Sequence, residues 1–203
     1  MKRSVFLIRH AEQEKDESPG AGIWQPKAPL KPGSSQRIQV AADYFAKEGI
    51  VFHRYWHSAL TRAVQTCEIL WELTTKSSPD LAPMSDNLML GPSRIGEWEA
   101  GYERWRLAQA DPAKPPLLDA PGFLKIMPDL IRTQALRTFQ AVKTIATQLP
   151  NKQNAAAISH IPLIPLAEWC ATGTTLRTHV EYCQAIEFVF EDDSVVSTKV
   201  HLY

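Results

Sequence analysis

Short runs of strand-forming residues alternate with helical stretches along this chain, and that alternation limits the folds open to it. Residues 4–8, 50–56 and 155–159 have the apolar, β-favouring composition of buried strands, and helical spacing of apolar residues follows each one. Two later runs, 185–190 and 195–202, flank an acidic turn as a hairpin. The pattern predicts an α/β fold, a three-layer α/β/α sandwich whose mainly parallel sheet has an antiparallel edge.

Residues that start or stop helices bound the helical stretches. One stretch ends at Gly49, and a second follows Ser58, which we expect to be its N-cap. A third amphipathic stretch covers 122–149, and the last begins at Pro162 and ends at Gly173. We therefore expect each of the first three strands to be followed by a helix.

Residues 79–121 interrupt this pattern. Pro, Gly, Trp and Arg concentrate there, and we expect only one short helix, around 102–109. Loops of this length are usually functional or disordered. The chain is therefore expected to form a single domain, residues 1–203, with an insertion at 79–121 that serves as a lid. Trp98 and Trp105 are expected to pack this insertion against the body.

The composition argues against several classes of protein. Lys plus Arg and Asp plus Glu each number 22, so no global field favours nucleic acid or an acidic membrane as a partner. No apolar run is long enough to span a bilayer. The odd number of cysteines, 3, without a C-x-x-C pair, favours a reducing cytoplasm. His53 and His57 lack a third ligand nearby, so no metal site is expected, and the sequence does not set the oligomeric state.

Cationic and imidazole side chains follow the three predicted parallel strands. Arg9 and His10 come after the first strand, Arg62 lies in the helical turn after the second, and His160 follows the third. The carboxyl ends of parallel strands meet at one edge of a sheet, so these side chains should lie close together. Two guanidinium forks match phosphate oxygens, and the N-termini of the following helices would add N–H groups. This arrangement predicts a phosphate pocket.

The order of motifs around these residues resembles the histidine phosphatase superfamily, also called the phosphoglycerate-mutase-like family. L-I-R-H-A-E at 7–12 is similar to its R-H-G signature, with Ala11 in place of the glycine. P-L-K-P-G-S-S-Q at 29–36 resembles its P-L-T-x-x-G-x-x-Q segment. S-A-L-T-R-A-V-Q-T at 58–66 and I-S-H at 158–160 match its helix start and its late strand-end histidine.

The resemblance implies a role for each residue of the pocket. His10 would be the nucleophile that becomes phosphohistidine, while Arg9 and Arg62 clamp the phosphoryl oxygens. His160 would stabilise the same oxygens as charge gathers in the transition state, and water would then hydrolyse the intermediate. No metal and no organic cofactor is implied, and the implied partner is a small phosphorylated substrate or a phosphohistidine protein.

The chain departs from the family at both customary positions of the proton donor. Pro92 stands where many members have a Glu, and Ile161 stands where others have an Asp after the second histidine. An alkoxide leaving group needs a proton in the transition state, an effect worth roughly 10² to 10⁴-fold. Glu97 is then the first candidate for the donor, followed by Glu99 and Asp86.

The leading hypothesis is a phosphatase that hydrolyses a phosphomonoester or a phosphoramidate. S-H-I-P-L at 159–163 resembles bacterial phosphohistidine phosphatases, which work without the usual acid. A mutase is disfavoured, because no extended C-terminal tail would shield the intermediate from water. The alternative from another class is a non-catalytic phospho-ligand binding module, a pseudo-phosphatase of the same fold that keeps both arginines and lacks turnover.

Overall fold

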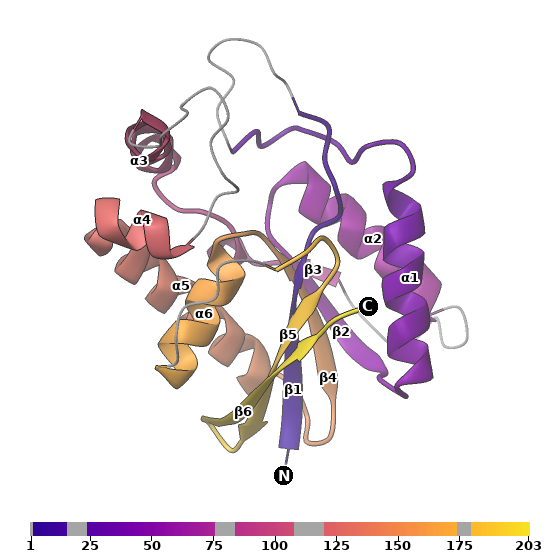
Figure 1. Ribbon diagram of the computed structural model, residues 1–203. Coiled ribbons are helices and arrows are strands. Elements are labelled where there is room, and N and C mark those ends of the chain that lie inside the picture. The colour runs from indigo at the N-terminus through magenta and orange to yellow at the C-terminus, as the bar shows by residue number, and fades with distance from the viewer. Residues whose placement is uncertain (1, 16–23, 76–83, 108–119, 174–179) are drawn as a thin grey trace.

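The computed structural model describes residues 2–15, 24–75, 84–107, 120–173 and 180–203. Within these ranges, 6 strands form one sheet in the order β3-β2-β4-β1-β5-β6 (Figure 1). The strands are β1 (Lys2–Arg9), β2 (Phe52–His57), β3 (Met84–Asp86), β4 (Asn154–Ser159), β5 (Ala185–Glu191) and β6 (Ser194–His201). β1 to β4 pair in parallel, while β5 runs antiparallel to β1 and β6 antiparallel to β5. The mainly parallel sheet with an antiparallel edge is confirmed.

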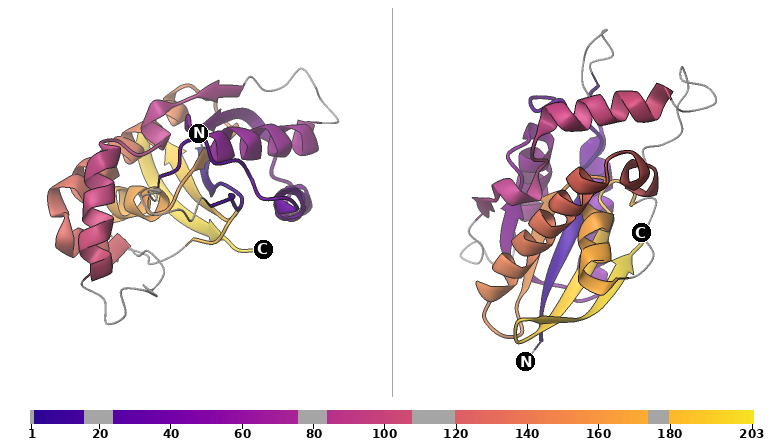
Figure 2. Two further views of the ribbon diagram at one scale, coloured as in Figure 1. Left: turned by 90° about the horizontal axis from the view of Figure 1, so that it is seen from above. Right: turned by 90° about the vertical axis from the view of Figure 1, so that its left-hand side faces the viewer.

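Helices cover both faces of this sheet (Figures 1 and 2). α1 (Ser34–Lys47) and α2 (Thr61–Thr75) pack on one face, and α5 (Pro128–Thr147) and α6 (Leu163–Thr172) pack on the other. α3 (Ile95–Leu107), α4 (Ala120–Ile126) and the 3₁₀ helix η1 (Leu88–Leu90) complete the described elements. The predicted three-layer α/β/α architecture is therefore confirmed.

The central strand β1 is buried on both faces because its apolar residues alternate between two cores. Val5 and Leu7 join the core under α5 and α6. Phe6 and Ile8 join the core under α1 and α2. All 4 side chains are at most 1% exposed, which explains why the strand is continuously apolar in the sequence.

Several predicted boundaries are wrong, and each error has a local cause. α2 begins at Thr61, and Val64 donates its N–H to the Leu60 carbonyl, so Ser58 is not the N-cap. The stretch 122–149 is two helices, because Pro128 opens a new helix directly after Met127. The short helix expected around 102–109 instead begins at Ile95 and ends at Leu107.

The described part of the predicted insertion contains the strand β3, the 3₁₀ helix η1, the packed helix α3 and the start of α4. β3 pairs with β2, and α3 buries Trp98 and Trp105 against residues of α5 and α6. The packing role expected of both tryptophans is thus confirmed. α3 lies beyond the carboxyl ends of the parallel strands (Figure 2). Residues 79–83 and 108–119 of the predicted lid lie outside the described residues.

Membrane insertion through a helix finds no support, since no helix of the described chain is both long enough and apolar enough to cross a bilayer.

Candidate active site

β1, β2 and β4 end at one edge of the sheet, where each passes into a loop or helix. This brings together residues that are distant in the sequence. The His10 N–H donates to the Ser159 carbonyl at 3.0 Å, which ties the end of β1 to the end of β4. The Ser58 N–H donates to the Ile158 carbonyl at 3.1 Å, which ties the end of β2 to the same strand. As a result the His10 and His160 rings lie 4.9 Å apart between centroids. The structure thus brings together both histidines that the sequence singled out.

His10 is held with one ring nitrogen bonded and the other facing a cation. Its Nδ1 lies 2.6 Å from the Ala11 carbonyl oxygen, and because that oxygen can only accept, Nδ1 carries the proton. The Nε2 atom then has a lone pair, and the Arg62 Nε–H donates to it at 3.1 Å. The ring is 6% exposed. His10 therefore presents an oriented, neutral nucleophilic nitrogen at the carboxyl end of β1.

His160 lies fully buried beside it. Its Nε2 lies 2.5 Å from the Ser58 hydroxyl oxygen, while its Nδ1 has no hydrogen-bond partner among the described residues. The Ser58 contact is a site feature that sequence reasoning missed, because a serine before a helix is read first as a cap. A buried polar atom without a partner is uncommon in folded proteins and often indicates a bound ligand or water.

Arg62 projects from the first turn of α2 and is only 2% exposed. Besides His10, it donates from one terminal nitrogen to the Gln25 carbonyl at 2.9 Å. Burial lowers the pKa of Arg62 to about 10, Tyr182 opposes that shift, and Arg9 adds to it. The guanidinium remains charged at neutral pH, and no carboxylate among the described residues pairs with it.

Arg9 is held by a segment that sequence reasoning did not connect with the site. A terminal nitrogen donates to the Val180 carbonyl at 2.8 Å, and the guanidinium carbon lies 3.7 Å from the centroid of the Tyr182 ring. Its Nε atom has no partner among the described residues, and burial lowers its pKa. The Tyr182 ring also lies 5.8 Å from the His10 ring. Tyr182 is therefore part of the site, although nothing in its sequence context indicated this.

Burial and nearby cations set the charge of the two imidazoles. Burial lowers the pKa of His10 well below its usual value, and Arg62 and Arg9 lower it further. The pKa of His160 is lowered well below its usual value by burial, then by His10 and the same two arginines. Both rings are therefore neutral at pH 7, and the net positive charge of the site comes from the two guanidiniums. Such a site favours a small anion.

The three carboxylates considered as proton donors differ in their contacts and exposure. Glu97 is half exposed and pairs with Arg94 at 2.5 Å, and Asp86 is exposed at the end of β3. Glu99 accepts the Trp24 backbone N–H at 3.0 Å.

Of the three carboxylates, Glu99 is connected to the site, because it bonds to Trp24, whose ring lies beside His160. The Trp24 ring stands edge-on to His160, with 5.7 Å between the centroids. Among the described residues, no carboxylate forms a hydrogen bond or ion pair with His10, Arg9, Arg62 or His160.

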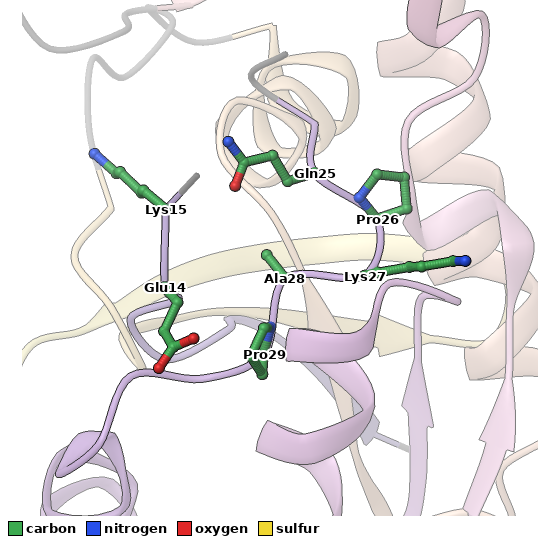
Figure 3. A pocket seen from close by; sticks show the side chains of 7 residues that line it. All are labelled: Glu14, Lys15, Gln25, Pro26, Lys27, Ala28 and Pro29. Carbon is green, nitrogen blue, oxygen red and sulfur yellow. The ribbon is translucent and has the colours of Figure 1, made fainter. Parts of the chain in front are cut away.

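An open hollow adjoins the site on the side of Arg62. It has a volume of about 520 Å³ and is lined by Glu14, Lys15, Gln25, Pro26, Lys27, Ala28 and Pro29 (Figure 3). The two lining segments are joined by a hydrogen bond from the Glu14 N–H to the Pro29 carbonyl, 2.9 Å long. Gln25 links the hollow to the site, because its carbonyl accepts from Arg62.

No group of three or more His, Cys, Asp or Glu side chains in the described ranges could hold a metal ion.

Comparisons with known proteins point to one family. A family model described as histidine phosphatase superfamily (branch 1) matches residues 5–201. No curated protein matches the chain.

Similar folds occur among solved structures. A phosphoglycerate mutase from Bacillus anthracis is 15% identical, with a TM-score of 0.64 over 98% of this chain and 92% of its own. A mycobacterial glucosyl-3-phosphoglycerate phosphatase is 13% identical, with a TM-score of 0.64 over 100% and 99% of the two chains. The protein histidine phosphatase SixA, solved with tungstate, is 14% identical, with a TM-score of 0.54 over 100% and 95%. At such identities the likeness shows a shared fold, of the phosphoglycerate-mutase-like kind.

Proposed function

Because this chain belongs to branch 1 of the histidine phosphatase superfamily, we propose that it is a phosphatase that works through a phosphohistidine on His10. The substrate class is a phosphomonoester or a phosphoramidate. The observation that carries the proposal is the state of His10: a neutral ring, oriented by Ala11, whose Nε2 lone pair faces the Arg62 guanidinium. A nitrogen in that state can attack phosphorus once an anion occupies the space between the arginines.

In the first step the Arg62 Nε–H leaves the Nε2 lone pair, which forms a bond to phosphorus while the bond to the leaving group breaks. The ring becomes cationic, and the Ala11 carbonyl, which accepts from Nδ1 at 2.6 Å, stabilises that charge. In the second step a water molecule attacks the phosphorus, the Nε2–P bond breaks, and inorganic phosphate leaves. His10 returns to the neutral form that its surroundings favour.

The other three side chains stabilise the transferring group in this proposal. Arg9 and Arg62 offer N–H groups to its equatorial oxygens, and their charge is not cancelled by a carboxylate in the described part of the site. His160 supplies its unpartnered Nδ1 as a further donor, which requires the Ser58 hydroxyl to donate to Nε2. These contacts grow stronger as charge gathers on the oxygens.

Two observations support a phosphorylated small molecule or a phosphohistidine protein as the substrate. The hollow beside Arg62 would accommodate the part of the substrate that is not transferred. SixA, one of the proteins with a similar fold, was solved with tungstate, a tetrahedral oxyanion like phosphate. The second candidate function is a phospho-ligand binding module, which is favoured because no carboxylate in the described part of the chain pairs with the four residues.

The proposal is tested with purified protein, p-nitrophenyl phosphate and a phosphohistidine peptide. The wild-type protein should turn over at least one substrate and, on rapid acid-free quenching, carry phosphate on His10. His10→Ala should lower kcat/KM at least 10³-fold, because the nucleophile is lost (~4 kcal/mol). His53→Ala, a half-buried histidine at the opposite end of β2, should change kcat/KM by less than about twofold.

The two functions give different outcomes. Turnover of neither substrate, together with phosphate-competable binding of the peptide that Arg62→Ala abolishes, would replace the phosphatase with the binding module.

A further inference from the structure

The residues proposed to bind and attack the phosphoryl group are a set of cations and imidazoles, and none of them is an acid in its resting state. His10 is the nucleophile, and His160 is a neutral ring whose Nε2 is engaged by Ser58. A leaving oxygen of high pKa would then depart without receiving a proton. The loss of general acid catalysis slows such a reaction roughly 10²- to 10⁴-fold. A hydroxyl group at the rim of the site bears on this problem.

Tyr182 lies at that rim because a tight turn is bonded to the end of β1. The Cys183 N–H donates to the Arg9 carbonyl at 3.0 Å, and the Arg9 N–H donates to the Gln184 carbonyl at 3.0 Å. Within the turn, the Gln184 N–H donates to the Glu181 carbonyl at 3.1 Å, and the Gln184 amide oxygen accepts the Glu181 N–H at 2.9 Å. The backbone on both sides of Tyr182 is therefore fixed relative to the strand that carries His10.

The Tyr182 side chain is fixed as well. The Arg9 guanidinium covers one face of the ring, with 3.7 Å between its carbon and the ring centroid. The ring lies 5.8 Å from the His10 ring and is tilted by 57° against it. The phenol raises the pKa of both Arg9 and Arg62, so its oxygen lies within electrostatic range of both guanidiniums. Tyr182 is half-buried, and its ring lies beside both Arg9 and His10, the two residues proposed to bind and to attack the phosphoryl group.

We propose that Tyr182 is the proton donor to the leaving group, which rests on the phosphatase function proposed above. As the Nε2–P bond forms and the P–O bond to the leaving group breaks, the phenol O–H bond breaks and its proton passes to the leaving oxygen. The phenolate that remains is stabilised by Arg9 and Arg62. When water attacks the phosphohistidine, it gives its proton back to the phenolate, so one cycle converts ester and water into alcohol and phosphate.

Other groups fit this role less well. The Ser58 hydroxyl is engaged with His160, and Glu97 is paired with Arg94 on an exposed turn of α3. Glu99 accepts the backbone N–H of Trp24, and the Trp24 ring, rather than Glu99, lies against His160. Glu181 is exposed next to Tyr182, and its charge raises the pKa of Arg9. It is therefore the alternative proton donor that the experiment must distinguish from Tyr182.

The test compares Tyr182→Phe with the wild type over a series of aryl phosphates and one alkyl phosphate. Tyr182→Phe keeps the ring beneath Arg9 and removes only the hydroxyl. With p-nitrophenyl phosphate, whose leaving group departs readily as an anion, kcat/KM should change by less than about threefold. With phenyl and alkyl phosphates it should fall by at least tenfold, so that the logarithm of kcat/KM falls more steeply with leaving-group pKa.

Two controls assign the effect to the hydroxyl. Glu181→Gln should keep the wild-type dependence on the leaving group; if it steepens that dependence and Tyr182→Phe does not, the donor is Glu181. An equal loss in Tyr182→Phe for all substrates, or no loss for any, overturns the proposal while phosphohistidine formation in the wild type leaves the phosphatase function intact. A wild-type protein that hydrolyses the phosphohistidine peptide but none of the series overturns the proton-donor proposal alone, and one that hydrolyses neither overturns both.

Discussion

Arg62 has an unusual position for a charged residue, since it is 2% exposed and yet meets no carboxylate among the described residues. Its Nε–H donates to His10, and one terminal nitrogen donates to the Gln25 carbonyl. Both bonds orient the fork, and the remaining N–H groups are left for a ligand. A buried guanidinium without a counter-ion costs folding free energy, so we interpret it as held in place for an anion that arrives with the substrate.

This interpretation predicts that the fork geometry matters as well as the charge. Arg62→Lys should lower kcat/KM by more than tenfold, because an ammonium is a point charge that cannot reproduce the planar, bidentate contact of a guanidinium with two phosphoryl oxygens. Steady-state kinetics with p-nitrophenyl phosphate measures the effect. Arg132→Lys, on the exposed side of α5, serves as the control and should be neutral. An unchanged kcat/KM in Arg62→Lys would mean that Arg62 does not contact the transferring group.

At this scale the sequence located some site residues and missed others for physical reasons. Arg9 ends β1, and His10 and His160 directly follow β1 and β4, so the strand pattern alone placed them at one edge of the sheet. Tyr182 depends on a turn in which Cys183 adopts φ 66°, a conformation that a glycine would signal and a cysteine does not.

Among the elements, α3 shows how the structured part of the insertion is attached to the body. Gly101 faces Met127, which lies between α4 and α5, and a Cβ atom at position 101 would lie 1.6 Å from the Met127 sulfur. Trp98 and Trp105, on the same helix, are buried in the core shared with α5 and α6. The close approach at Gly101 lets the helix backbone come near enough for both tryptophans to be covered.

Gly101→Ala should therefore lower the free energy of unfolding by about 1–3 kcal/mol, because Met127 is buried and must move. Gly96→Ala in the same helix is the matched control, since a Cβ there meets nothing within 4 Å. It should raise stability by about 0.5–1 kcal/mol. Urea unfolding followed by tryptophan fluorescence compares the two, and equal effects would contradict the packing argument.

The elements that sequence analysis misjudged are those whose limits depend on tertiary contacts. β3 has only 3 residues, too few for an alternating pattern, and its pairing with β2 defines it. α3 begins well before the stretch whose spacing indicated a helix, because burial of Trp98 against α5 and α6 extends it. β1 and β4, by contrast, are buried on both faces, and their apolar runs indicated them well.

For the whole molecule, two buried neutral imidazoles link stability to pH. Burial, followed by the nearby charges, lowers the pKa of His10 and of His160 well below the usual histidine value. Below pH ~6.5 the unfolded chain binds protons at these positions and the folded chain does not. Folding is therefore disfavoured progressively as the pH falls through that range, and no such penalty exists above it.

The expected result is a fall in the free energy of unfolding between pH 7 and pH 5, by up to about 1.4 kcal/mol per pH unit for each ring. Carboxylates contribute at lower pH, so the comparison with His10→Asn isolates one ring. The variant should show a shallower slope, whatever its absolute stability. Urea titrations at half-unit pH steps measure both slopes, and equal slopes would show that His10 takes up a proton in the folded state as readily as in the unfolded one.

The pocket between the guanidiniums has a consequence for catalytic throughput. The product of the proposed reaction carries the same tetrahedral group as the substrate, and the N–H groups of Arg9 and Arg62 would bind that group in both. Released phosphate would therefore compete with incoming substrate for the same N–H groups. An enzyme built in this way slows as its own product accumulates, and its output follows the phosphate level around it.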